Sequence, residues 1–284
     1  MIRIEHETNR AVSLFHQERL LCRYVYVPQL PEIEAPRPYF HPLNSLAGDT
    51  LTNFRPNDHP WHHGLSLTLN DVSGVNFWGG PTYFREGGYK MQTRHGSQHH
   101  IGWQRLEARE TESVLAHSIE WRDAGDVLFR EERSLVIKVD EKAGAWTLHW
   151  NSSLNNVSGR TLSLGNPHSN GGLNGSHYTG LQFRGARELL DDHLDPRIAV
   201  KAEGDRTGID AVHGSAAKWM EWHGQSDTSL RRIVIRFENS AGPLHWFVRR
   251  NNPLVAFPVQ YDRNLDLAAG ANLVLDHTLT FTGA

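Results

Sequence analysis

The chain has 284 residues, a formal net charge of −3 and a pI near 6.6, so it lacks the basic surplus typical of a nucleic-acid-binding protein. No apolar run approaches the roughly 20 residues needed to cross a bilayer, and the N-terminal residues lack the apolar core of a signal peptide. The only cysteine, Cys22, excludes an intramolecular disulfide and lies in an apolar run typical of a buried strand. We therefore expect a cytoplasmic protein with no nucleic-acid or membrane partner.

Short strands separated by turns are predicted along almost the whole chain. Apolar and polar residues alternate with a period of two, as from Gly64 to Leu69, which is typical of a strand with one dry face. The best helix candidate is the segment 185–194, and no linker or repeat is visible. Residues 1–284 are therefore predicted to form a single all-β domain, a large antiparallel β-sandwich. The predicted strands are 11–16, 19–27, 64–69, 75–78, 100–108, 113–122, 127–139, 145–151, 161–164, 217–222, 231–238, 245–248 and 272–281.

The segment 37–80 holds the densest group of polar side chains that folding alone does not require. Its four prolines disfavour helices and central strands, and fixed loops often carry catalytic or binding groups. Residues 58–64, DHPWHHG, combine three imidazoles, a carboxylate and an indole. We interpret this segment as the floor of a site. The histidines of the segment 37–80 are His41, His59, His62 and His63.

Three segments resemble the opening motifs of the bacterial PmoA-like family: RPYFHP at 37–42, DHPWHHGL at 58–65 and VNFWG at 75–79. The segments GLQFR at 180–184 and RRNNP at 249–253 resemble further family positions more loosely. The resemblance implies a fold similar to the galactose-mutarotase-like β-supersandwich and an association with sugar oxidoreductases and other carbohydrate enzymes. The family label refers to a methane oxygenase, but that membrane enzyme needs spanning segments that this chain lacks, so we do not expect that activity.

Two kinds of chemistry suit the histidines of DHPWHHG. An unperturbed imidazole pKa of about 6.5 lies near working pH, so His63 and His59 are the leading acid–base candidates. Neutral imidazole is also a common metal ligand, so His59, His62 and His63 could bind a divalent metal. Structural hydrogen bonding is the third interpretation of the same residues.

Two later segments carry groups that suit sugar hydroxyls, which both donate and accept hydrogen bonds. The glycine- and asparagine-rich segment 166–178 contains two histidines, although it could also be a flexible surface turn. The segment 245–252 contains Arg249, whose planar fork could hold an oxyanion or a carboxylate. We expect residues 168–177 of the first segment, together with the segment 245–252, to meet the segment 41–63 in one concave pocket. The predicted sugar-binding residues are His41, Trp61, Trp78, His168, His177 and Arg249.

These features predict a carbohydrate-active protein, as an enzyme that acts on a sugar or a keto-glycoside by histidine-assisted proton transfer, of the epimerase, lyase or hydrolase type. Two alternatives stay open: a non-catalytic carbohydrate-binding or regulatory sandwich, and a metal-dependent hydrolase or lyase of oxidised glycosides. No Walker loop, nucleophile elbow or dinucleotide-binding glycine pattern occurs, so no cofactor is expected beyond a possible divalent metal. The expected partner is a small-molecule carbohydrate.

Overall fold

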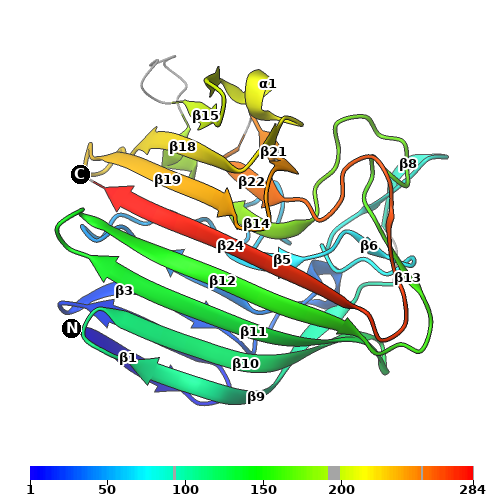
Figure 1. The fold of residues 1–284 in the computed structure, drawn as a ribbon, viewed down its shortest axis with the longest axis horizontal. Coiled ribbons are helices and arrows are strands. Elements are labelled where there is room, and N and C mark those ends of the chain that lie inside the picture. Colours follow the sequence, from blue (N-terminus) through cyan, green and yellow to red (C-terminus); the bar gives the residue numbers. More distant parts are fainter. Residues whose placement is uncertain (92–93, 191–198, 251, 284) are drawn as a thin grey trace.

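The computed structural model describes residues 1–91, 94–190, 199–250 and 252–283, and its regular secondary structure is almost entirely β-strand (Figure 1). Neighbouring strands in every described sheet pair antiparallel. The predicted all-β, antiparallel fold class is therefore confirmed. Among the described residues, no helix has the length and apolar character needed to span a membrane.

The first large sheet has eight strands. Its middle strands β5, β14 and β22 are buried on both faces, because the inter-sheet core covers one face and loops cover the other. In β14, Leu181 and Phe183 belong to the core, so Gln182 and Arg184 point to the loop-covered face. In spatial order the strands are β1 (Ile2–Glu7), β2 (Ala11–His16), β3 (Arg19–Val25), β4 (Tyr39–Leu43), β5 (Leu65–Thr68), β14 (Gly180–Arg184), β22 (Leu254–Phe257) and β21 (Phe247–Arg249).

The second large sheet has nine strands and faces the viewer in Figure 1. Its long strands alternate over most of their length between buried and more exposed residues, so one face is dry and the other is wet. In spatial order the strands are β16 (Arg206–Thr207), β15 (Val200–Ala202), β18 (Trp219–Gln225), β19 (Arg232–Asn239), β24 (Asn272–Gly283), β12 (Ala145–Asn156), β11 (Asp126–Asp140), β10 (Glu112–Asp123) and β9 (Ser97–Ala108).

Smaller elements complete the described chain. A three-stranded sheet and two two-stranded sheets extend the sandwich, and the helical segments are single turns. These elements are β23 (Leu265–Leu267), β13 (Leu162–Gly165) and β6 (Asp71–Val72), then β17 (Ala216–Ala217) with β20 (Leu244–His245), β7 (Thr82–Phe84) with β8 (Gly88–Lys90), α1 (Ile209–Val212), and the 3-10 turns η1 (Glu32–Glu34) and η2 (Arg187–Leu189).

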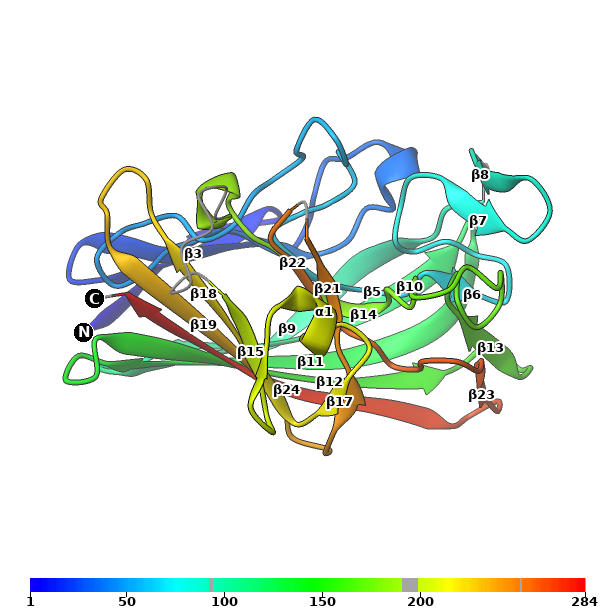
Figure 2. The ribbon, with the colours of Figure 1, turned by 90° about the horizontal axis from the view of Figure 1, so that it is seen from above.

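The hydrophobic core lies between the two large sheets, which Figure 2 shows as separate layers with both termini at one end. Cys22 is fully buried there, as predicted. The core also encloses an ion pair between Glu131 and Arg133, both fully buried. Glu131 accepts further hydrogen bonds from Trp121 Nε1 at 2.7 Å and Ser152 Oγ at 2.6 Å, so its charge is well satisfied.

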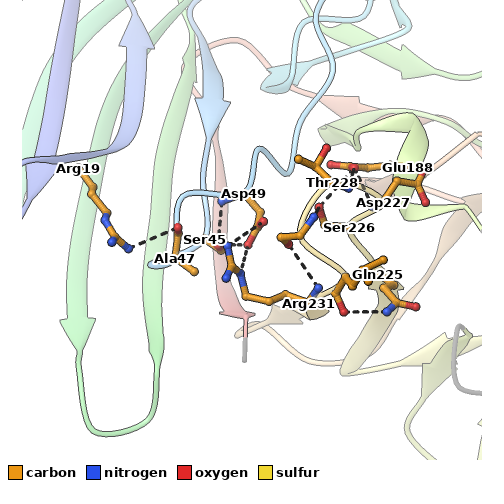
Figure 3. Close-up of polar contacts among 12 residues, drawn as sticks. Arg19, Ser45, Ala47, Asp49, Glu188, Gln225, Ser226, Asp227, Thr228 and Arg231 are labelled. Atoms are coloured by element: carbon orange, nitrogen blue, oxygen red, sulfur yellow. Dashed lines mark hydrogen bonds and ion pairs between the residues drawn. The ribbon is translucent and has the colours of Figure 1, made fainter.

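At the end of the sandwich near the termini, an ion pair links two loops (Figure 3). Arg231, between β18 and β19, donates to the nearly buried Asp49 from Nε at 2.9 Å. Ser45 Oγ donates to the same carboxylate at 2.9 Å. Hydrogen bonds from Arg231 and serines outweigh the effect of burial, which would raise the pKa of Asp49, and the net result is a lowered pKa.

The structure corrects three local predictions. The segment 185–194 contains the 3-10 turn η2 in place of a longer helix, and its residues 191–194 lie outside the described residues. The segment 75–78 makes only isolated bridges, because Asn76 Oδ1 accepts from the backbone N–H groups of Trp78 and Gly79 and turns the chain. Strand β4 occupies residues predicted as loop, and Pro42 lies at an irregularity in its pairing with β3.

Candidate functional site

A cavity of about 750 Å³ opens over the face of the first sheet that points away from the inter-sheet core. Several parts of the chain line it: the loop before β5, residues of the segment 78–81, the single residues Tyr89 and Tyr178, the turn around α1, and residues 247–250, 252 and 254. The predicted convergence of the segment 41–63 with the segment 245–252 is therefore present in the structure. None of the residues 168–177, which were expected to meet the same pocket, lines the cavity; the adjacent Tyr178 does.

An aspartate–histidine pair stands at the wall of this cavity. His59 Nδ1 lies 2.8 Å from Asp58 Oδ2, and the His59 ring lines the cavity while remaining partly exposed. Because an ionised carboxylate only accepts hydrogen bonds, Nδ1 is the donor, and Nε2 of the neutral ring is left as an acceptor. This arrangement leaves Nε2 able to accept a hydrogen bond or a proton from a molecule in the cavity.

Arg184 of β14 fixes the position of the Asp58 carboxylate. Its Nη2 donates to both carboxylate oxygens at 3.0 and 3.1 Å, and the exposed Arg187 adds a third contact at 3.2 Å. Burial alone would raise the pKa of Asp58, but the hydrogen bonds from His59 and Arg184 outweigh it and leave that pKa far below its usual value. Asp58 therefore stays ionised over the working pH range.

The same guanidinium sets the tautomer of His62. Arg184 Nη1 lies 3.0 Å from His62 Nδ1, and arginine has no acceptor, so Nδ1 must accept and the ring proton sits on Nε2. Burial, followed by the positive charges nearby, lowers the pKa of His62 well below 6.5. His62 thus presents to the cavity a neutral imidazole whose remaining polar group is an N–H donor.

A chain of neighbouring rings runs along the cavity wall from this end to the other. The His59 and His62 rings stack at 4.8 Å, and His62 meets Trp78 edge-on at 5.9 Å. Trp78 packs on Tyr178 at 4.9 Å, and Tyr178 contacts Phe247 at 5.5 Å. Trp61 adds a further aromatic face beside His59. The middle of the cavity is therefore aromatic, with His59 and His62 at one end of the chain of rings and His213 beside Phe247 at the other.

The other end carries positive charge. Arg249 lines the cavity with its guanidinium carbon 4.5 Å from the centre of the Phe247 ring. Its neighbour Arg250 forms an ion pair with Asp210, and both side chains are exposed. His213 also lies here, and its Nε2 donates to the Gly175 carbonyl at 2.9 Å.

The structure places His63, the first acid–base candidate, away from the cavity. The side chain is fully buried, and Nε2 lies 3.0 Å from Glu34, which also receives a two-pronged ion pair from Arg55. Burial and the charge of Arg37 lower the pKa of His63 to about 4. A sealed, neutral histidine cannot exchange a proton with a ligand in the cavity, so this placement does not fit the catalytic role predicted for His63.

Three predicted sugar-binding histidines also lie outside the cavity wall. His41 in β4 hydrogen-bonds Thr52 Oγ1 at 3.0 Å. His168 stacks on Tyr261 at 5.3 Å, and the fully buried His177 contacts the Trp246 carbonyl through Nε2 at 3.2 Å. His177 packs behind the cavity-lining residues His213 and Phe247, so it supports the wall without reaching the cavity. By contrast, His59, Trp61, Trp78 and Arg249 line the cavity as expected.

The three imidazoles considered as metal ligands do not converge. His59 turns to Asp58, His62 to Arg184 and His63 to Glu34. In the described part of the chain, no group of three or more histidine, cysteine, aspartate or glutamate side chains is arranged to hold a metal ion.

Sequence reasoning did not assign roles to Arg184, Tyr178 or His213. The segment GLQFR alternates apolar and polar residues, which is equally typical of a strand whose polar face meets water. Only the loops folded over that face show that Arg184 is a buried organising residue. The pairing of β14 with β5 places this arginine beside the end of the DHPWHHG loop.

Comparisons with known proteins give one match in sequence and several distant matches in structure. A family described as a family of unknown function, DUF6807, matches residues 11–283. No curated protein matches the chain. An α-galactosidase from Lactobacillus brevis is 10% identical with a TM-score of 0.45, covering 100% of this chain and 39% of the galactosidase. The GH36 α-galactosidase AgaA from Geobacillus stearothermophilus is 9% identical with a TM-score of 0.41, and the match covers 100% of this chain and 40% of that galactosidase.

A galactose mutarotase related enzyme from Lactobacillus acidophilus is 9% identical with a TM-score of 0.38, covering 99% of this chain and 97% of that enzyme. The chain thus spans about two fifths of the length of the α-galactosidases that it matches. These likenesses are too distant to carry a function, and none of these matches supports the resemblance to the PmoA-like family.

Proposed function

The chain belongs to the DUF6807 family, whose function is unknown, and we propose from its cavity that it is an enzyme that binds a sugar or a keto-glycoside and moves a proton on it through His59. The observation that carries this proposal is the Asp58–His59 pair in the wall of a cavity with an aromatic middle. Cavities of several hundred Å³ with aromatic walls and a few convergent polar groups are typical small-molecule sites.

The aromatic walls support a sugar as the ligand. Trp61, Trp78 and Tyr178 offer flat apolar faces against which the C–H faces of a pyranose ring can pack. Indole N–H and phenol O–H groups at their edges can meet hydroxyls, since such side chains combine an apolar body with a polar tip. A sugar ring, apolar on its faces and polar on its rim, matches this combination.

The proton-transfer step uses groups with complementary properties. His59 Nε2 accepts a proton from carbon or oxygen, and the ionised Asp58 stabilises the imidazolium that results. The Nε2–H of the neutral His62 donates to an oxygen on which negative charge develops. Arg184 contacts both Asp58 and His62, so one buried side chain positions the acceptor and the donor together.

The test is proton exchange on candidate sugars. The protein is incubated in D₂O with a panel of mono-, di- and 3-keto-sugars, and NMR records anomer interconversion, elimination and C–H to C–D exchange. We expect His59→Gln to lower the rate on the active sugar by roughly 10²-fold or more. Its affinity for that sugar should stay within a few-fold, because most of the wall is unchanged.

A matched control is the His149–Asp276 pair. It has the same chemistry, with Nε2 2.9 Å from the carboxylate, but it lies on strands β12 and β24 of the second sheet and does not line the cavity. His149→Gln should leave the rate unchanged. An unaltered rate in His59→Gln would refute the catalytic role, and tight sugar binding without any turnover by the unmodified protein would favour the non-catalytic binding alternative.

A further inference from the structure

Arg249 differs from the buried arginines of this protein because its guanidinium has almost no hydrogen-bond or ion-pair partners. Its guanidinium is half-buried, yet within the described residues its only hydrogen bond is from Nη2 to Ser176 Oγ at 3.3 Å. No carboxylate among those residues pairs with it. A guanidinium carries five N–H donors, so most of them are unused. Its unpaired nitrogens are accessible to solvent, and the side chain lines the cavity. The unused donors therefore face the cavity.

The fully buried arginines show what the fold does with a guanidinium that it uses only for structure. Arg37 donates to the carbonyls of Glu34, Ala35 and Trp61 and to Ser66. Arg133 is paired with Glu131 and also donates to Tyr24 and Gln98. Arg184 is shared between Asp58 and His62. Each of these cations has several partners within the protein, whereas Arg249 has one.

The groups around Arg249 leave its charge uncompensated. Asp210 and Arg250 neutralise each other at the rim. Tyr178 hydrogen-bonds Tyr89 at 3.1 Å, and burial raises the pKa of Tyr178 well above 10, so this phenol is neutral. Burial also lowers the pKa of Arg249 itself, which is the expected cost of removing a cation from water without a counter-ion. Among the described residues, the end of the cavity opposite His59 and His62 therefore has a net charge of about +1.

We propose that the cavity takes an acidic sugar, a pyranose bearing a carboxylate of the uronic acid type, with the carboxylate held by Arg249. This inference rests on the proposed function, since it names the substrate class of the same cavity. The planar fork of arginine matches the two oxygens of a carboxylate, and such paired bonds are stronger than neutral ones. Phe247 fixes the guanidinium from one face, and Tyr178 offers its ring for the sugar beside it.

A carboxylate fits the available charge better than a phosphate does. One unpaired guanidinium balances one negative charge, and the neighbouring cavity groups are neutral or already paired. A phosphate monoester carries nearly two negative charges at neutral pH and would leave one of them uncompensated. Sugar phosphates are therefore weaker ligands on this proposal.

The experiment compares matched neutral and acidic sugars by calorimetry at pH 7. The probes are methyl glucoside and methyl galactoside, the corresponding methyl glucuronide and methyl galacturonide, and glucose 6-phosphate. We expect at least one uronide to bind about tenfold or more tightly than its neutral partner, since hydrogen bonds to charged groups are the stronger class. Arg249→Gln should abolish this ratio, and Arg249→Lys should restore only part of it because a lysine lacks the fork. Arg250→Gln, the adjacent cation already paired with Asp210, should keep the ratio.

The possible failures are separable. If neutral sugars bind as well as the uronides and Arg249→Gln leaves the ratio unchanged, the acidic-sugar inference is overturned and the sugar-binding proposal stands. If glucose 6-phosphate binds more tightly than the uronides, a phosphate replaces the carboxylate and the inference is again overturned. If none of the probes or sugars of the exchange panel binds, the proposed function fails and this inference fails with it. Thermal melting of each variant confirms that it is folded.

Discussion

Replacing His63 with glutamine tests the structural role that its burial assigns to it. Nε2 lies 3.0 Å from Glu34 Oε2, and the ring packs against Tyr39 at 5.5 Å and Phe54 at 5.6 Å. The glutamine amide can still donate to Glu34, but it loses both ring contacts. With about 0.5–1.5 kcal/mol for each aromatic pair, we expect a loss of about 1–3 kcal/mol in the free energy of unfolding at pH 7.

The pH dependence is the sharper signature of the same change. Burial, with Arg37, lowers the pKa of His63 from 6.5 to about 4, so between these values the unfolded chain binds a proton at this residue that the folded chain does not bind. Stability due to His63 is therefore present above about pH 6.5 and is lost as the pH falls. At 1.36 kcal/mol per unit, this amounts to about 2 kcal/mol between pH 7 and pH 5. Glutamine does not titrate. The difference in the free energy of unfolding between wild type and His63→Gln should therefore be smaller at pH 5 than at pH 7 by that amount.

Urea unfolding followed by tryptophan fluorescence at pH 7 and pH 5 measures the gap. A gap that stays constant or widens at pH 5 would show that His63 is protonated and paired with Glu34 as an ion, contrary to the reasoning from burial. Catalysis offers a second readout on the active sugar. The rate per folded molecule should change by no more than a few-fold in His63→Gln, in contrast with the roughly 10²-fold loss expected for His59→Gln.

Two further predictions concern charges that the fold holds inside. Arg133→Met should lower the free energy of unfolding, measured with urea, by about 3–5 kcal/mol because it leaves Glu131 buried without its counter-ion. Adding Glu131→Leu to this variant should recover most of that loss. A double variant no more stable than Arg133→Met alone would contradict this prediction. Asp49→Asn should cost about 1–3 kcal/mol at pH 7 by weakening the charged hydrogen bonds from Arg231. Since the pKa of Asp49 is lowered on folding, this difference should fade as the pH drops below about 4, and a difference that persists at pH 3 would count against it.

The strands of the sandwich were predictable because their signal is local. A period of two in side-chain polarity needs only the neighbouring residues, so the strands β2, β3, β10, β11 and β19 appear close to their expected places. The short strands β7, β15, β16 and β23 carry too few residues for such a pattern, and they form because tertiary neighbours pair with them.

The sequence also located much of the cavity wall, since a dense run of prolines and polar rings has few purely structural uses. His59, Trp61 and Trp78 were found in this way, and Arg249 was found from the separate segment 245–252. Composition could not separate His62 from His63, because adjacent residues in an irregular loop have no fixed period to decide which one faces inward. That choice depends on the partners, Arg184 for His62 and Glu34 for His63.

Only the tertiary structure decides which charged side chains have a partner of opposite charge. Arg184 is 122 residues from His62 in sequence, and it reaches that ring because β14 pairs beside β5. Arg249 and Arg250 are adjacent, chemically identical and both border the cavity, yet Arg249 has unused donors whereas the exposed Arg250 is paired with Asp210. Hydrogen bonding and desolvation act over a few ångströms in space, so they cannot be predicted from how far apart two residues are along the chain.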